Sequence, residues 1–319
     1  MGSIDSDFAY DDAFKTMVVE SDELVLPLLN EMFGEHYRGD ERIIRYGNEH
    51  YIEQGGGSEE KRITDSLLGV AGEQGEVKKY HVECESGTDG SMLARFFEYD
   101  TQIALDDSEY GNYRLTLEFP HSGVLFLRGG KMPDEMTVEF RTPGGNVSYP
   151  VRVMRMTDYT VDDFFEKRLY FLIPFYIFNL EKRLAEIDGD AGKLEELKDV
   201  YRGIAARMEE TVERGGLEEF SETVIKEMSN RVANKLARKY GNVRKGIGDL
   251  MGGKVLETEA VRIKREGKME GRREGKREGK REIIETMLRK GQSPEQVADL
   301  TELPIDFVRS VEQSILQMA

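Results

Sequence analysis

The sequence predicts an α/β or α+β fold over the first half of the chain and helices over the second half. Strand-like segments rich in β-branched and aromatic residues occur between residues 62 and 154, with helical patterns before and between them. From Thr160 onward, apolar residues recur at helical spacing. About five strands combined with such helices are expected to pack around one core.

Two helices are predicted near the N-terminus. Residues 11–18 begin with two aspartates, and acidic side chains are stabilised at the positive end of a helix dipole. Residues 24–33 carry a second helical pattern, which ends at Gly34. The polar residues that follow end in a glycine-rich turn at residues 55–58.

The predicted sheet begins with a hairpin. Residues 62–68 and 80–86 are strand-like, and the segment between them contains a turn of Gly and Glu at residues 72–76. A helix over residues 92–105 has apolar residues at helical spacing, so we expect it to pack across the sheet. Further strands are predicted over residues 123–128, 136–140 and 149–154.

The second half of the chain is predicted to be helical. Thr160 is a suitable N-cap, with two aspartates in the turn after it. The aromatic-rich residues 164–184 are expected to be buried, and two long amphipathic helices follow over residues 191–214 and 217–240. A last helix is expected over residues 304–316, after a helix start at Ser293 and Pro294.

Residues 254–281 contain a repeat of period four that places a glycine at positions 267, 271, 275 and 279. Each glycine costs a helix about 1 kcal/mol relative to alanine. The segment is therefore either a solvated linker or a helix that associates with a second copy along its glycine stripe. Residues 282–319 have only three basic side chains against seven acidic ones, which favours a small packing module over a DNA-binding helix-turn-helix.

The composition excludes several classes of protein. None of the apolar segments approaches the ~20 residues that a transmembrane helix needs. The acidic N-terminus has no signal-peptide pattern, and the single cysteine, Cys84, fits the reducing cytoplasm. A net charge of −17 argues against binding nucleic acid over the whole surface, but it allows a local basic track.

Two carboxylates are predicted to project from one face of the second hairpin strand. Glu83 and Glu85 are two residues apart, so in an extended strand they point to the same side, together with His81. Asp65 lies in the first hairpin strand. Because like charges repel unless solvent or a cation relieves them, we hypothesise that Asp65, Glu83 and Glu85 hold a divalent metal ion.

A glycine-rich segment near residue 250 imitates a phosphate-binding loop. Residues 248–254 have the P-loop spacing, but Val255 stands where that motif has Ser or Thr, and no apolar strand precedes the segment. Glycines at the C-terminus of a helix explain it better, so we exclude a P-loop here.

Four pieces of the sequence resemble one family. Asp12 to Lys15 form D-x-F-K, Asp65 ends a strand, His81 to Glu85 form H-x-E-x-E, and Arg95 and Tyr99 lie four residues apart on the next helix. This ordered set resembles the Rpn family of recombination-promoting nucleases and putative transposases, in the PD-(D/E)XK superfamily. The resemblance covers about residues 8–180 and rests on the order of these motifs along the chain.

The resemblance implies a restriction-endonuclease-like fold: a mixed sheet flanked by helices, with an all-helical C-terminal extension. It also implies DNA cleavage that depends on Mg²⁺ or Mn²⁺, in a cytoplasmic setting linked to recombination, transposition or mobile-element defence. By resemblance, Asp65 and Glu83 are metal ligands, and the backbone carbonyl of Cys84 adds a third ligand. Glu85 falls where the family has lysine or glutamine, so it would act as a base or a further ligand, or mark a weakened enzyme.

Several other residues receive accessory roles. Asp12 is expected to supply an upstream acid, with Glu31 as its rival. Arg95 would contact a phosphate, or else form a salt bridge with Glu98 or Asp100. Tyr99 is expected in the core, and for His81 a structural role is favoured over a catalytic one.

The sequence thus leads to one function and one alternative. The first is a metal-dependent DNA endonuclease with catalytic Asp65, Glu83 and Glu85. The alternative is a weakened or inactive nuclease-fold scaffold that assembles through its C-terminal helices, with a homo-oligomer expected through residues 254–319. The expected regions are a nuclease-like core (1–180), a helical extension packed on it (181–253), the glycine-striped segment (254–281) and a small helical module (282–319).

Overall fold

The computed structural model describes most of the chain. Its described residues are 10–46, 49–54, 58–63, 66–72, 76–87, 90–106, 108–111, 113–130, 132–251, 284, 287–288, 292–301, 305, 308–309 and 311–312. The chain divides into two compact units, residues 1–255 and 256–319. Each unit is described by itself.

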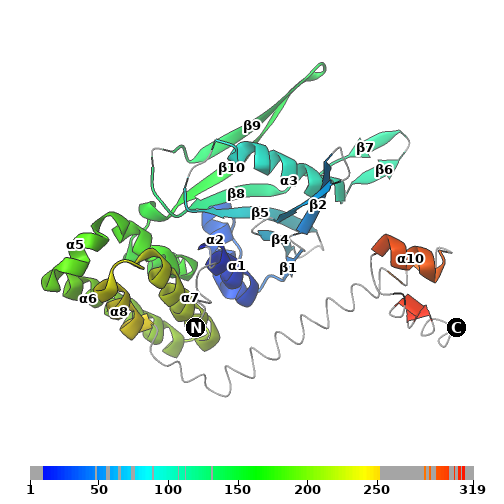
Figure 1. Ribbon diagram of the computed structural model, residues 1–319. Helices are drawn as coiled ribbons and strands as arrows, with labels where there is room; N and C mark the ends of the chain where they lie inside the picture. Colours follow the sequence, from blue (N-terminus) through cyan, green and yellow to red (C-terminus); the bar gives the residue numbers. More distant parts are fainter. Residues whose placement is uncertain are drawn as a thin grey trace. The chain divides into compact units, whose positions relative to one another are not determined.

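A mixed sheet of six strands forms the centre of the first unit (Figure 1). The central three strands are parallel, and the outer pairs are antiparallel. In spatial order the strands are β1 (Ile43–Arg45), β4 (Ser66–Ala71), β5 (Val77–Glu85), β8 (His121–Phe126), β10 (Gly145–Arg155) and β9 (Glu135–Thr142). The predicted α/β class is therefore confirmed, as a mixed sheet with helices.

Two short ribbons accompany the sheet. β2 (Glu49–Gln54) pairs with β3 (Ser58–Ile63), and β6 (Glu109–Gly111) pairs with β7 (Arg114–Thr116). The predicted hairpin is present as β4 and β5, with Ser66 opposite Val82. The range predicted for its first strand, residues 62–68, covers the end of β3 and the start of β4, and β4 continues to Ala71.

Helices cover both faces of the sheet. Phe33, the last residue of α2 (Asp22–Phe33), contacts Tyr80 of β5 at a ring distance of 4.9 Å. Phe96 of α3 (Met92–Asp106) contacts His81 at 5.0 Å. Since neighbouring residues of a strand point to opposite faces, α2 and α3 lie on opposite sides of β5, as Figure 1 shows.

The helix boundaries follow local capping signals. Gly34 adopts a left-handed conformation (φ 70°) and donates its N–H to the Asn30 carbonyl, which ends α2 where the sequence predicts. Thr160 and Asp163 form a capping box at the start of α4 (Val161–Glu166). α1 (Tyr10–Glu20) precedes α2 and packs Phe14 against Phe171 at 5.2 Å.

The aromatic-rich segment after α4 is buried, as expected, but most of it is a 3₁₀-helix, η2 (Tyr170–Arg183). A short 3₁₀ turn, η1 (Met156–Asp158), precedes α4. The remaining helices of the first unit are α5 (Leu184–Gly189), α6 (Ala191–Glu213), α7 (Glu219–Leu236) and α8 (Gly241–Met251). Among the helices that the structure describes, none combines the length and hydropathy needed to cross a membrane.

The second unit has a small apolar core of Ile284, Val297, Val308 and Val311. Its helix α10 (Pro294–Thr301) begins at the predicted position, where Ser293 and Gln296 exchange backbone-to-side-chain hydrogen bonds. Residues 252–283, which include the glycine repeat, lie outside the described residues.

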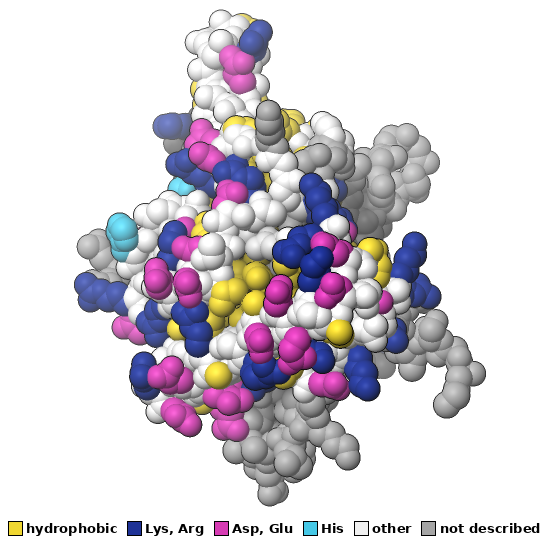
Figure 2. Space-filling model, turned by 90° about the vertical axis from the view of Figure 1, so that its left-hand side faces the viewer, with side chains coloured by type: hydrophobic (Ala, Val, Ile, Leu, Met, Phe, Trp, Pro, Cys, Tyr) yellow, Lys and Arg dark blue, Asp and Glu magenta, His cyan; other side chains and the backbone are white. Residues whose placement is uncertain are grey.

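The surface of the molecule mixes both signs of charge. On the face shown in Figure 2, Lys and Arg side chains alternate with Asp and Glu side chains around an area of exposed hydrophobic side chains. A surface of this kind gives nucleic acid no broad basic area on this face. On this face, a phosphate contact would have to come from a local group of cations.

Gly123 of β8 lets α2 approach the sheet closely. A Cβ atom there would lie 2.4 Å from Met32 Sδ and 2.9 Å from Phe33 Cζ. We expect Gly123→Ala to lower the free energy of unfolding by about 1–3 kcal/mol, because the core must shift to admit the methyl group.

Gly203→Ala is the matched control for that prediction. Gly203 lies inside α6, and nothing lies within 4 Å of the added methyl group. We expect it to stabilise the protein by roughly 0.5–1 kcal/mol. Urea unfolding measures both, and equal effects of the two substitutions would contradict the close packing of α2 on β8.

Candidate functional site

The end of β5 extends past the described part of β4. β4 begins at Ser66, opposite Val82, whereas Glu83, Cys84 and Glu85 continue the pairing with β8. The Glu85 carbonyl accepts a hydrogen bond from Leu127 N–H on the β8 side. Because successive carbonyls of a strand point to opposite sides, the Cys84 carbonyl points toward the β4 side.

His81, Glu83 and Glu85 lie on the face of β5 that α3 covers. His81 Nε2 is 2.8 Å from Glu83 Oε1, and the His81 ring packs against Phe96. The opposite face of β5 buries Tyr80, Val82 and Cys84. The period of two in the sequence therefore predicts correctly which side chains share a face.

His81 is fully buried between two carboxylates. Its Nδ1 is 2.7 Å from Asp100 Oδ1 on α3, and its Nε2 contacts Glu83. Burial lowers the pKa of His81, but the hydrogen bonds to Asp100 and Glu83 outweigh it and raise the pKa to about 9. At neutral pH His81 is therefore an imidazolium that donates to both carboxylates.

Asp100 binds two further donors. Its Oδ2 accepts hydrogen bonds from Ser122 Oγ at 2.7 Å and from Tyr149 OH at 3.0 Å. Burial and the charge of Asp100 raise the pKa of Tyr149 well above its ordinary value. One buried carboxylate on α3 thus connects β5, β8 and β10.

A pocket of about 410 Å³ opens at the end of β5. β5 contributes Glu83, Cys84 and Glu85 to its lining. Arg95 of α3 also lines it and forms an ion pair with Glu85. The sequence predicts a phosphate contact for Arg95, or a salt bridge with Glu98 or Asp100, and the structure adds Glu85 as its partner.

Two lysines from other helices line the same pocket. Lys15 of α1 pairs with Asp11 at 3.0 Å, and the Lys235 ammonium of α7 lies 5.0 Å from the centre of the Tyr10 ring. Neither lysine is among the site residues that the sequence predicts. Lys15 belongs to the D-x-F-K motif, so the sequence contains a signal that could have assigned it to the site. No local sequence pattern marks Lys235.

Of the other predicted site residues, the structure places Tyr99 at this pocket but not Asp12, and it does not describe Asp65. Asp65 lies outside the described residues. α1 contributes Asp11 to the pocket lining, and Asp12 is not among the lining residues. Tyr99 is 8% exposed, packs on His81 at 5.8 Å and also lines the pocket.

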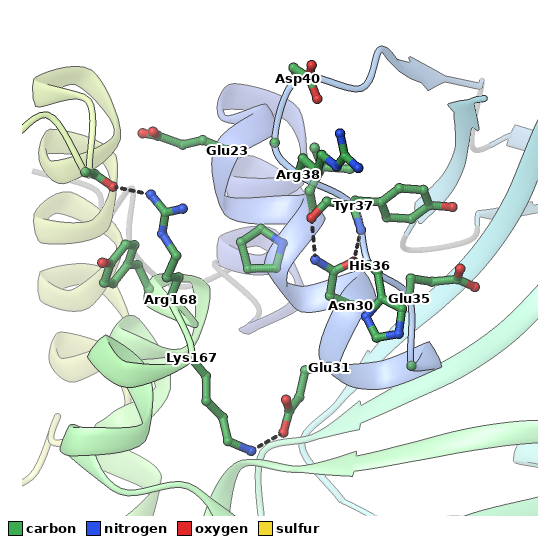
Figure 3. Close-up of a pocket in the computed structure, with 16 residues that line it drawn as sticks. Glu23, Asn30, Glu31, Glu35, His36, Tyr37, Arg38, Asp40, Lys167 and Arg168 are labelled. Carbon is green, nitrogen blue, oxygen red and sulfur yellow. Dashed lines mark hydrogen bonds and ion pairs between the residues drawn. The ribbon is translucent and has the colours of Figure 1, made fainter. Parts of the chain in front are cut away.

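Glu31, the rival upstream acid, lies in a different cavity of about 760 Å³ (Figure 3). There it accepts hydrogen bonds from Lys167 at 2.6 Å and from Tyr159 OH at 3.1 Å. Nearby, Asn30 makes two hydrogen bonds with the backbone of Tyr37. Several polar groups of this cavity thus satisfy one another, which is typical of a structural groove.

The donors at the end of β5 suit a hard divalent cation. Two carboxylates and a backbone carbonyl are the oxygen ligands that Mg²⁺ and Mn²⁺ prefer. Within the described ranges, no group of three or more His, Cys, Asp and Glu side chains is arranged to hold a metal ion. Among the described residues, the end of β5 thus offers two carboxylates and a carbonyl, and Asp65 directly precedes β4 in the sequence.

The raised pKa of His81 predicts a pH-dependent stability. The His81 imidazolium stabilises the folded state fully below about pH 6.5, the pKa of an unfolded histidine. This stabilisation is lost as pH rises through about 9. We expect the free energy of unfolding to fall by up to about 3 kcal/mol over this range, measured by urea unfolding in EDTA.

Two substitutions separate the contribution of His81 from other titrating groups. His81→Gln should flatten this pH dependence, whereas His36→Gln, at an exposed histidine, should keep it. An unchanged pH dependence in His81→Gln would show that the imidazolium does not stabilise the fold.

Comparisons of the chain with protein-family models, with curated proteins and with solved structures give no match. The resemblance to the Rpn nucleases thus rests on the motifs of the sequence.

Proposed function

We propose that this protein is a Mg²⁺-dependent endonuclease that hydrolyses phosphodiester bonds of DNA in the pocket at the end of β5. The observation that carries the proposal is the composition of this pocket. Glu83 and Glu85 project from one face of a strand end, and Lys15, Arg95 and Lys235 line the pocket with them. Metal-dependent phosphodiester hydrolysis needs acidic ligands and cations beside the phosphate.

In this proposal the metal ion is held by Asp65, Glu83 and the Cys84 carbonyl. A bound Mg²⁺ or Mn²⁺ would polarise the scissile phosphate and lower the pKa of a coordinated water. The mixed sheet flanked by helices is compatible with the restriction-endonuclease-like fold that we propose for residues 1–180.

His81 acts as a positioning residue. It donates a hydrogen bond to one oxygen of Glu83, which fixes the carboxylate at the pocket wall. The ring itself is held by Asp100, so Glu83 is oriented by a buried and rigid chain of hydrogen bonds. The positive charge of His81 also reduces the repulsion between Glu83 and Glu85.

Arg95 and the two lysines provide the contacts to phosphate. Glu85 holds the Arg95 guanidinium at the pocket. Position 85 is the strand position at which the family pattern has a lysine or glutamine. Arginine binds phosphate through two parallel hydrogen bonds, and lysine acts as a point charge. The local cations thus permit DNA binding by a chain whose net charge is −17.

One observation favours a second candidate function, the non-catalytic scaffold. Both carboxylates of β5 have protein cations as partners, His81 for Glu83 and Arg95 for Glu85. In the scaffold, these pairs satisfy the carboxylates without a metal ion, and the charges of the strand only stabilise the fold. Assembly through residues 254–319 is compatible with either function.

Nicking of supercoiled plasmid in Mg²⁺ or Mn²⁺ tests the proposed activity. We expect cleavage by the wild-type protein and a loss of at least about 100-fold in Asp65→Ala and Glu83→Gln, because an acidic ligand is removed. Glu31→Gln, at a carboxylate in the other cavity, should cleave like wild type. Cleavage that persists in Glu83→Gln would refute the site, and an inactive wild-type protein would favour the scaffold.

The two lysines make a separate prediction about DNA binding. Lys15→Ala and Lys235→Ala should each weaken binding to a duplex and lower the slope of log K against log salt by about 1. Fluorescence anisotropy at several salt concentrations, with Ca²⁺ replacing Mg²⁺, measures both quantities.

The control for these lysines is Lys193→Ala on α6. Lys193 pairs with Glu186 and does not line the pocket. We expect its substitution to leave affinity and salt slope unchanged. Equal behaviour of all three variants would show that DNA does not enter the pocket at the end of β5.

A further inference from the structure

The central sheet ends in a long strand, β9, whose outer edge pairs with no other strand that the structure describes. β9 is the last strand in the spatial order and has β10 as its neighbour (Figure 1). It has eight residues, whereas β1 at the opposite border of the sheet has three. An edge strand of this length presents a row of backbone N–H and C=O groups on which a further strand can pair.

The pairing with β10 shows which backbone groups of β9 face outward. Val153 N–H donates to the Asp134 carbonyl at 3.0 Å, so the residue before β9 bonds to β10. In an antiparallel pair, residues that bond to the neighbouring strand alternate with residues that bond outward. Thr137 lies opposite Pro150, which has no N–H to donate, in agreement with this alternation. The residues whose N–H and C=O groups face outward are therefore Glu135, Thr137, Glu139 and Arg141.

The two faces of β9 differ in chemistry. Met136 and Val138 are partly buried against the core cluster on the α3 side, and Phe140 contacts Phe97 of α3 at 5.2 Å. The four outward-bonding residues named above have exposed side chains on the other face. A strand that pairs with β9 must therefore match apolar side chains on one face and charged side chains on the other.

β9 is complementary to a second copy of itself. When two copies run antiparallel about a two-fold axis at Val138, Glu135 lies opposite Arg141 of the second copy. This pair occurs twice, because the axis relates two identical surfaces. On the α3 side, Met136 lies opposite Phe140 of the second copy, and Val138 lies opposite itself. Opposite charges and apolar pairs directly across two strands both stabilise a sheet.

The charges of β9 also oppose the neighbouring registers. An axis at Thr137 would place Glu135 opposite Glu139, and an axis at Glu139 would place that carboxylate opposite its own copy. Like charges directly opposite each other destabilise a sheet. With the axis at Val138, the outward-bonding residues meet one another in pairs that form about eight backbone hydrogen bonds. This register aligns almost the full length of the strand without a repulsive pair.

We propose that two chains associate through β9 in this antiparallel register, so that their two central sheets join into one. The axis is perpendicular to the sheet, so α3 lies on the same face of the joined sheet in both copies. The two copies of β5 run in opposite directions, and their pockets lie at opposite ends of the joined strands. The association therefore does not depend on the proposed nuclease activity, and it uses a surface other than residues 254–319.

Sedimentation velocity of the full-length protein in EDTA, over a range of concentrations, tests the association. We expect the wild-type protein to self-associate as its concentration rises. Thr137→Pro should weaken this association at least about 10-fold, because proline removes an outward N–H group and leaves the hydrogen bonds to β10 intact. A wild-type protein that stays monomeric at every concentration would overturn the proposal.

Exchanged charges show whether the partner is a second copy. Arg141→Glu and Glu135→Arg should each weaken self-association at least about 10-fold, because each dimer then contains two repulsive pairs. Mixing these two variants should restore association, since both pairs between the different chains are again of opposite charge. Arg202→Glu, the same change of charge at an exposed arginine of α6, should associate like wild type.

Circular dichroism confirms that each of these variants is folded. Unchanged self-association in both Thr137→Pro and Arg141→Glu would overturn the proposal and place any interface on another surface. A mixture of the two charge variants that associates no better than either variant alone would exclude the pairing of Glu135 with Arg141.

A cysteine at position 138 tests the register. Residues opposite each other at a non-hydrogen-bonded position have Cα atoms about 4.5 Å apart, which a disulfide can span. Val138→Cys should therefore cross-link two chains under mild oxidation at least about 10-fold faster than Thr137→Cys, and the native Cys84 is buried. Faster cross-linking of Thr137→Cys, at the more exposed position, would indicate random collision and overturn the register.

Discussion

The buried imidazolium of His81 is the interaction on which the first unit depends. It lies between Asp100 and Glu83 with no exposed surface, and Asp100 receives Ser122 and Tyr149 as further donors. The charges are compensated only as a set, so removing one partner would leave an uncompensated buried charge, at a cost of about 3–5 kcal/mol. This set holds α3 on the sheet and also fixes Glu83, so the stability of the core and the geometry of the site have one origin.

The pocket at the end of β5 depends on segments that are far apart in the sequence. Arg95 comes from α3, Lys15 from α1 and Lys235 from α7, and all three line one pocket with the two carboxylates of β5. The helices after residue 180 are therefore more than a support for the sheet, because α7 supplies a cation to the pocket. A chain with a net charge of −17 needs such convergence to create a local site for an anion.

Sequence reasoning succeeds here where the signal is local. The period of two placed His81, Glu83 and Glu85 on one face, and capping residues gave the starts or ends of helices at Gly34, Thr160 and Ser293. Such signals are absent where partners meet only in the folded chain. The sequence indicates Asp100 only as a salt-bridge partner of Arg95, and Lys235 has no local pattern at all. The same limit applies to the short strands β2, β3, β6 and β7, whose pairing decides their structure more than their composition does.

Under the proposed function, the formal charges of the pocket make Glu85 compatible with hydrolysis. Asp11, Glu83 and Glu85 carry three negative charges, and Lys15, Arg95 and Lys235 carry three positive ones. Under the proposed function, Asp65 adds one negative charge, a divalent metal adds two positive charges and a phosphodiester adds one negative charge. The sum is then zero only when metal and substrate are both bound. A lysine in place of Glu85 would raise this sum by two, so under the proposed function the lysines of the two helices take the place of a cation on the strand.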